Sequence, residues 1–165
     1  TTDWEVELVA VIGRAADHVA PADAWSHVAG LSVGQDISDR HLQFAAGGQF
    51  SLGKSRRGFG PIGPWLVTPD EFANPDDLEL GCSVNGEVMQ TGRTSDLIFD
   101  VSRLIVELSA ILPLLPGDVI FTGTPGGVGL ARQPPRFLHA GDVLETWIEG
   151  IGTIRNQIIE DHPSA

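Results

Sequence analysis

The chain has 165 residues and is 42% hydrophobic, enough for one hydrophobic core but not for several independent domains. Its 22 acidic residues against 10 Lys and Arg give a formal net charge of −12, which disfavours nucleic acids and anionic membranes as partners and favours cations or small molecules. No apolar run approaches the roughly 18 residues of a membrane span, and the single Cys82 excludes an intrachain disulfide, so we expect a cytoplasmic protein.

Alternating apolar residues and turn signals predict a chain made mostly of β-strands. Asn85-Gly86 is the strongest short hairpin signal in the sequence, and Gly-Asp pairs open two later strands. The predicted strands and extended stretches cover residues 4–12, 25–36, 78–84, 87–92, 116–124, 140–150 and 152–159.

One helix is expected in the second half of the chain, because apolar residues recur at helical spacing from Leu97 to Leu112. Asp100 or Ser102 is expected to cap this helix, and Pro113 is expected to end it. A shorter turn or helix is expected to begin near Ser38.

Two glutamates lie at the start of the first predicted strand. Because side chains alternate along a strand, Glu5 and Glu7 share one face. The strand is otherwise apolar on both faces, so we expect it to be buried on both, where two carboxylates repel one another and lose hydration unless a cation neutralises them. A hard divalent ion such as Mg²⁺ would do so. The alternative is that both glutamates lie in water at the rim of the sheet.

A second polar group follows in "GQDISDRHLQF". Asp36, Arg40 and Gln43 are four and three residues apart, so they would share one face of a helix. The carboxylate could complete a metal site, while the guanidinium and the amide could bind a carboxylate or carbonyl of a substrate. An ordinary Asp/Arg pair on a helix is the alternative.

Two glycine-rich segments carry the remaining candidates. Lys54 lies within a long loop expected at 45–64, where the flanking glycine allows close approach to a ligand and the ammonium could stabilise developing negative charge. A phosphate-binding loop is not expected, because no strand leads into the segment and no helix pattern follows. The turn "FTGTPGGVG" presents Thr122 and Thr124 with backbone N–H groups that could hold an anion. Ordinary turn chemistry is the alternative.

In their order along the chain, these segments resemble the catalytic domain of the fumarylacetoacetate hydrolase family. The resemblance runs from about Asp3 to Ile158. It implies one domain over residues 1–165, with an α+β fold that is mostly β, a mixed β-sandwich roll, and assembly as a homodimer. The similar blocks are DWEVELVAVIG, GQDISDRHLQ, LGKS, FGPIGPWLVT, VNGEVMQTGRTSDLIFDV, LLPGDVIFTGTPGGVG and FLHAGDVLETWIEGIGTIRN.

The resemblance also implies a metal site. Glu5, Glu7 and Asp36 match the positions of the family's metal ligands. Mg²⁺ is the expected ion, with Mn²⁺ or Ca²⁺ able to replace it.

Four further positions match residues that the family uses for substrate binding and catalysis. Arg40 and Gln43 match residues that reach the substrate, and Thr124 matches a threonine that contacts its oxygens. Lys54 matches the active-site lysine, for which we expect both substrate contact and a catalytic role. The expected substrate is a small anionic oxo acid.

The chain departs from the family pattern in two places. Arg57 and Gly58 stand where family members often have Asp and Thr, so a different and more anionic substrate is expected. Family hydrolases draw a water-activating His/Glu pair from a lid upstream of the glutamate strand, and only Thr1 and Thr2 lie upstream of the matching block. We therefore expect a domain truncated at its N-terminus, with chemistry that needs no lid as the alternative.

These inferences predict an Mg²⁺-dependent hydrolase that cleaves a C–C bond in a β-diketo acid of the acylpyruvate or fumarylacetoacetate type. One alternative is a decarboxylase of 2-oxo acids such as oxaloacetate, or a keto-enol isomerase of aromatic catabolism, neither of which needs an attacking water. A second alternative is a truncated domain that binds metal without catalysis.

Overall fold

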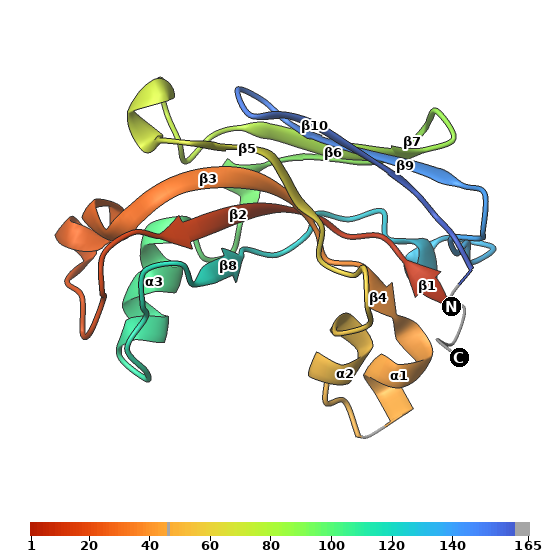
Figure 1. The fold of residues 1–165 in the computed structure, drawn as a ribbon, viewed down its shortest axis with the longest axis horizontal. Coiled ribbons are helices and arrows are strands. Elements are labelled where there is room, and N and C mark those ends of the chain that lie inside the picture. Colours follow the sequence, from red (N-terminus) through yellow and green to blue (C-terminus); the bar gives the residue numbers. More distant parts are fainter. Residues whose placement is uncertain (46, 161–165) are drawn as a thin grey trace.

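Two antiparallel four-stranded sheets dominate the computed structural model, which describes residues 1–45 and 47–160 (Figure 1). The strand order is β5-β3-β2-β8 in the first sheet and β10-β9-β6-β7 in the second, and a short pairing joins β1 to β4. The strands are β1 (Thr2–Asp3), β2 (Val6–Ile12), β3 (Val28–Gln35), β4 (Ser38–Asp39), β5 (Ile62–Val67), β6 (Glu79–Val84), β7 (Glu87–Arg93), β8 (Val119–Phe121), β9 (Val143–Ile148) and β10 (Gly152–Gln157).

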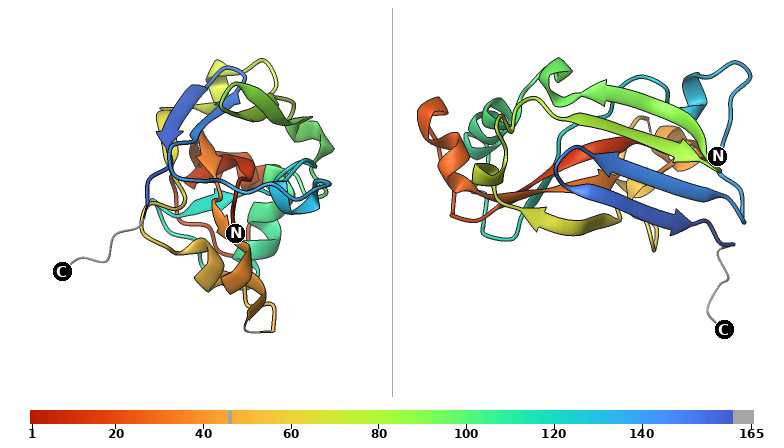
Figure 2. Two further views of the ribbon diagram at one scale, coloured as in Figure 1. Left: turned by 90° about the vertical axis from the view of Figure 1, so that its right-hand side faces the viewer. Right: turned by 90° about the horizontal axis from the view of Figure 1, so that it is seen from above.

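Short helices flank the sheets. Helices α1 and α2 lie on the side of the first sheet that faces away from the second, and α3 lies beside β8 (Figure 1, Figure 2). Within the described ranges, no helix is long and apolar enough to cross a membrane. The helices are α1 (Arg40–Ala45), α2 (Ser51–Lys54) and α3 (Val101–Ser109), with 3₁₀ turns η1 (Pro21–His27), η2 (Pro69–Glu71), η3 (Thr94–Asp96) and η4 (Gly129–Ala131).

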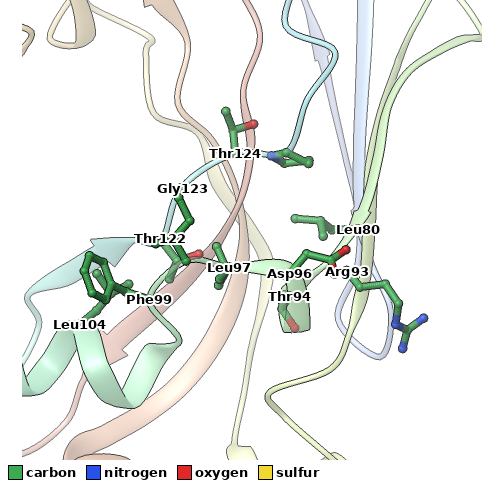
Figure 3. Close-up of a pocket in the computed structure, with 12 residues that line it drawn as sticks. Leu80, Arg93, Thr94, Asp96, Leu97, Phe99, Leu104, Thr122, Gly123 and Thr124 are labelled. Atoms are coloured by element: carbon green, nitrogen blue, oxygen red, sulfur yellow. The ribbon is translucent and has the colours of Figure 1, made fainter.

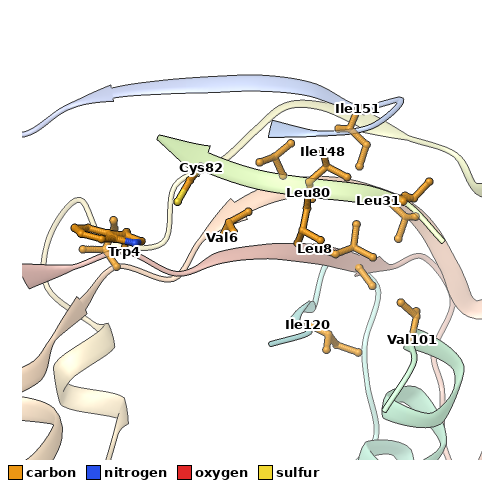
Figure 4. Packing of buried hydrophobic residues seen from close by; sticks show 14 of the residues in the cluster. Trp4, Val6, Leu8, Leu31, Leu80, Cys82, Val101, Ile120, Ile148 and Ile151 are labelled. Atoms are coloured by element: carbon orange, nitrogen blue, oxygen red, sulfur yellow. The ribbon is translucent and has the colours of Figure 1, made fainter. Parts of the chain in front are cut away.

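Apolar side chains between the two sheets form the core (Figure 4). On β2, Val6 and Leu8 occupy alternate positions and are fully buried. They belong to one cluster with Leu80 and Ile148 of the second sheet. Val9, on the opposite face of β2, is also fully buried. The strand is therefore buried on both faces, as the sequence predicted.

The Asn-Gly hairpin forms as predicted. Asn85 and Gly86 have φ angles of 52° and 84°, the positive values that a two-residue turn of this kind requires. The turn joins β6 to β7, which pair in antiparallel register.

The predicted long helix is shorter than expected. It covers Val101–Ser109 rather than Leu97–Leu112, and Asp100 caps it by accepting a hydrogen bond from the Arg103 N–H at 2.7 Å. At the other end, the Leu108 carbonyl accepts N–H groups from two successive residues, which tightens the chain into a turn before Pro113.

Two expected segments differ in kind. The extended stretch predicted at 25–36 becomes a strand only at Val28, because the preceding residues form η1, where Pro21 at the first position favours a helical turn. The segment expected to be a loop at 45–64 contains α2 and the start of β5. Gly-Pro within β5 weakens its strand pattern, and proline is tolerated there because β5 is an edge strand.

Replacing Leu8 tests the core. Leu8→Ala should lower the free energy of unfolding by about 2–5 kcal/mol, because it removes packed methyl groups and leaves a cavity. Val88→Ala, at a residue that is 55% exposed on β7, is the control and should change it by about 0.5 kcal/mol or less. Urea denaturation measures both, and equal losses would contradict the packing described here.

Candidate metal centre

Three carboxylates converge at the N-terminal end of β2. Glu5 and Glu7 lie on the face opposite the inter-sheet core, and Asp36 directly follows β3. The strands pair with Val6 opposite Gln35, and the Asp36 N–H donates to the Glu5 carbonyl at 2.9 Å. One carboxylate oxygen of each acidic residue lies within 4.8 Å of the other two. Strand pairing therefore brings together side chains that are about thirty residues apart.

Burial makes this cluster costly to ionise without a further cation. Glu7 is 3% exposed, and its carboxylate accepts the Gly123 N–H at 2.6 Å. Burial, and then repulsion from Asp36 and Glu5, raise the pKa of Glu7 to about 8, although the Gly123 hydrogen bond opposes the shift. Burial also raises the pKa of Asp36 against the opposing effect of Lys54.

Lys54 reaches the cluster from the last residue of α2. Its Nζ donates to Glu5 Oε2 at 2.8 Å and to Asp36 Oδ2 at 2.6 Å. Helix α2 packs closely on α1 because residue 53 is glycine, where a Cβ would lie 2.8 Å from the backbone nitrogen of Gln43. The glycine beside Lys54 thus allows the two helices to approach closely. This close packing places the Lys54 ammonium within reach of the carboxylates.

Arg40 is buried beside the same carboxylates. Its Nη1 donates to Glu5 Oε1 at 2.6 Å and to Gln43 Oε1 at 2.9 Å, while Nε donates to Asp3 Oδ2 at 2.8 Å. Arg40 and Gln43 share one face of α1, as expected. Asp36 does not share that face, because α1 begins at Arg40 and Asp36 owes its position to its place after β3.

Asp3 is a member of this network that was not among the predicted site residues. Its side chain is fully buried, and Oδ1 accepts the N–H groups of Trp4 at 2.8 Å and Gly129 at 2.7 Å. Its Oδ2 accepts the Leu130 N–H at 2.9 Å. The signal in the sequence is its position two residues before Glu5, which extends the period-two spacing of the glutamates.

The loop after β8 borders the cluster. Thr124 Oγ1 accepts a hydrogen bond from Gln90 Nε2 at 2.9 Å, and Gln90 Oε1 in turn accepts the Val6 N–H at 3.0 Å. Gln90, which sequence reasoning did not single out, therefore ties this loop to β2. Thr124 is linked to the carboxylates through its neighbour, Gly123, which donates to Glu7.

A cavity of about 330 Å³ opens beside the same loop (Figure 3). Thr122, Gly123 and Thr124 form one wall, and Leu97 and Leu104 contribute apolar surface. None of the three clustered carboxylates lines it. The loop thus separates an apolar cavity from the acidic cluster.

The charge of the network fits a divalent cation. In the described part of the chain, its four carboxylates face two cationic side chains, those of Arg40 and Lys54. When fully ionised, the network therefore has an excess of two negative charges, which one dication would balance. Its candidate metal ligands are carboxylate oxygens, which suit Mg²⁺, Mn²⁺ or Ca²⁺ better than metals that prefer thiolate or imidazole.

Curated relatives match almost the whole chain. The human mitochondrial oxaloacetate tautomerase FAHD2A is 47% identical over 158 residues, which are 95% of this chain and 50% of that protein. The 2,4-didehydro-3-deoxy-L-rhamnonate hydrolase of Sphingomonas sp. (strain SKA58) is 48% identical over 159 residues, 96% of this chain and 56% of that protein. The chain thus spans about half the length of the curated relatives it matches.

Solved structures share the fold. The fumarylacetoacetate hydrolase of Exiguobacterium antarcticum has a TM-score of 0.93 and 42% identity, covering 97% of this chain and 57% of that one. The fumarylpyruvate hydrolase of Pseudomonas aeruginosa, solved in complex with Mn²⁺ and pyruvate, has a TM-score of 0.87 and 31% identity, covering 97% and 66%. The expected mostly-β fold of this family is therefore confirmed.

The family model that matches is described as the C-terminal part of fumarylacetoacetate (FAA) hydrolase, and it covers residues 1–159. Its extent agrees with the ordered blocks found in the sequence. The chain belongs to the fumarylacetoacetate hydrolase family.

Proposed function

We propose that this domain is the catalytic domain of a metal-dependent hydrolase that cleaves a C–C bond in a β-diketo acid of the acylpyruvate or fumarylacetoacetate type. The observation that carries the proposal is the convergence of Glu5, Glu7 and Asp36 beside the Lys54 ammonium. The substrate is a small anionic oxo acid, and Mg²⁺ is the proposed ion, with Mn²⁺ or Ca²⁺ able to replace it.

The three carboxylates would hold the ion, whose chemistry when bound would be that of a Lewis acid for the oxo group and the adjacent carboxylate of the substrate. Lys54, already within hydrogen-bonding distance of two of these residues, would donate to the oxygen that gains negative charge as the C–C bond breaks. It could then return a proton to the carbon of the resulting enolate.

The proposed substrate contacts differ in how far the geometry supports them. Gln43 and Thr124 are proposed to orient the substrate. Arg40 already contacts Glu5, Gln43 and Asp3, which supports a role in fixing Glu5, while substrate contact by Arg40 stays a prediction. Among the described residues, no histidine hydrogen-bonds to the clustered carboxylates, so the water-activating His/Glu pair also stays a prediction.

Keto-enol tautomerisation, or decarboxylation, of a 2-oxo acid such as oxaloacetate is the second candidate. Two observations favour tautomerisation: the position of Lys54, where an amine could move a proton between oxygen and carbon, and the 47% identity to a protein named oxaloacetate tautomerase. Both candidate reactions need the same carboxylates and the same lysine. They differ in the need for an attacking water.

A substrate panel with and without Mg²⁺ or Mn²⁺ separates these candidates. Release of pyruvate from an acylpyruvate supports the hydrolase, whereas metal-dependent loss of enol-oxaloacetate or release of CO₂ supports the second candidate. Metal binding without turnover, together with activity of a full-length protein containing this domain, would support a domain that binds metal but does not catalyse alone. A homodimeric state and a cytoplasmic location are proposed as well and stay predictions.

Glu7→Gln tests the metal assignment. The amide can still accept the Gly123 N–H, so the fold should be retained, but the site loses a charged ligand and one of its two excess negative charges. Mn²⁺ affinity measured by calorimetry should fall by about 100-fold or more, beyond the loss typical of outer-shell changes. Unchanged affinity in a folded variant would refute the assignment.

Lys54→Ala tests the catalytic role of the lysine. Turnover should fall by about 100- to 1000-fold, as for loss of one donor to a developing oxyanion. Mn²⁺ affinity should be kept or raised, because the ammonium no longer shares Glu5 and Asp36 with the ion. Normal turnover combined with a large loss of metal affinity is the result that contradicts this role.

A further inference from the structure

The geometry points to Asp3 as a positioning residue: we infer that it acts through Arg40 to set which oxygen of Glu5 faces the metal site. This inference rests on the proposed function, since it concerns the metal ligand Glu5. The hydrogen bonds of Asp3 go to backbone N–H groups and to Arg40. Any effect of Asp3 on the orientation of Glu5 therefore passes through the Arg40 guanidinium.

A series of contacts connects Asp3 to the carboxylate cluster through Arg40. Arg40 Nε donates to Asp3 Oδ2 at 2.8 Å, and Nη2 lies 2.8 Å from the same oxygen as a charge contact without aligned hydrogen-bond geometry. On its other side, Arg40 Nη1 donates to Glu5 Oε1 at 2.6 Å. The other oxygen, Glu5 Oε2, therefore faces Lys54 and accepts a hydrogen bond from its Nζ at 2.8 Å. The orientation of the Glu5 carboxylate thus depends on the Arg40 guanidinium, whose position is fixed by Asp3.

Asp3 is itself fixed more firmly than a surface carboxylate. It is fully buried and accepts three backbone N–H groups, from Trp4, Gly129 and Leu130. At Gly129 a Cβ would clash with the Arg136 carbonyl oxygen and would lie 2.6 Å from Asp3 Oδ1, so the close approach of η4 requires glycine. These three backbone N–H groups hold the Asp3 carboxylate in place where solvent does not reach it.

Asp3 also affects the net charge around the metal site. Its carboxylate balances Arg40, so that the guanidinium does not cancel the charge of Glu5. Without Asp3, the positive charge of Arg40 would act on Glu5 alone and the excess negative charge of the network would fall from two to one. Outer-shell partners that orient and tune metal ligands in this way commonly change metal affinity.

Asp3→Asn is the direct test, because it keeps the side-chain shape but removes the charge. We expect Mn²⁺ affinity of the folded chain, measured by calorimetry, to fall by about 10-fold or more. Asp118→Asn is the matched control: Asp118 also accepts a backbone N–H at 2.7 Å, from Leu115, but it lies beside the far end of β2. The control should bind Mn²⁺ as the wild type does.

A double-mutant cycle separates this role from a merely structural one. In an Arg40→Gln background, Asp3→Asn should change Mn²⁺ affinity by less than about 2-fold, because no guanidinium remains to transmit its effect. An equal loss in both backgrounds, or no loss when Asp3→Asn is made alone in a folded protein, overturns the inference. Wild-type protein that binds no Mn²⁺ would overturn the proposed function as well.

Amide hydrogen exchange of the wild type covers the case in which Asp3→Asn does not fold. If Asp3 links the metal site to the backbone N–H groups that donate to it, saturating Mg²⁺ should slow exchange of the Gly129 and Leu130 amides by at least about 10-fold more than that of Leu115. The Leu115 amide is a fair reference because it also donates to a carboxylate, that of Asp118. Equal slowing at all three amides would overturn the inference.

Discussion

An excess of negative charge, held against a sheet face from which water is largely excluded, is the constraint on which the rest of the site depends. Glu7 is 3% exposed, and an ionised carboxylate at such a position is costly unless a cation lies nearby. Arg40 and Lys54 both contact Glu5, whereas Glu7 accepts a backbone N–H from Gly123. When Glu7 is ionised, the uncompensated charge is therefore concentrated around it, where a hard dication would gain most.

The fold meets this constraint by using the two faces of β2 for different purposes. One face contributes Val6 and Leu8 to the inter-sheet core, which fixes the strand and hence its other face. On that other face, helices α1 and α2 supply the two cations, each from a helix end. The stability of the sandwich thus supports a charged centre that would not be stable by itself, and the chemistry proposed for it is the formation of an enolate from an oxo acid.

The predictable part of the site was the part encoded by local spacing. Period-two alternation put Glu5 and Glu7 on one face, and i, i+3 spacing put Arg40 and Gln43 together, both correctly. Helical spacing does not apply to Asp36, because long-range pairing of β2 and β3 positions it. Similarly, β5 was missed because Gly-Pro obscures an edge strand. The same reasoning overlooked Asp3 and Gln90, because a buried polar residue is identified by partners that are distant in sequence, such as Gly129 or Thr124.

The most direct test of the account is to locate the ion. Crystals of the protein grown with Mn²⁺ and oxalate, a mimic of the chelating end of an oxo acid, would show the metal by anomalous scattering. The account predicts one peak at about 2.0–2.6 Å from carboxylate oxygens of Glu5, Glu7 and Asp36, the range for hard dications. Peaks elsewhere, with these three side chains pointing apart or bonded only to Lys54 and water, would contradict it.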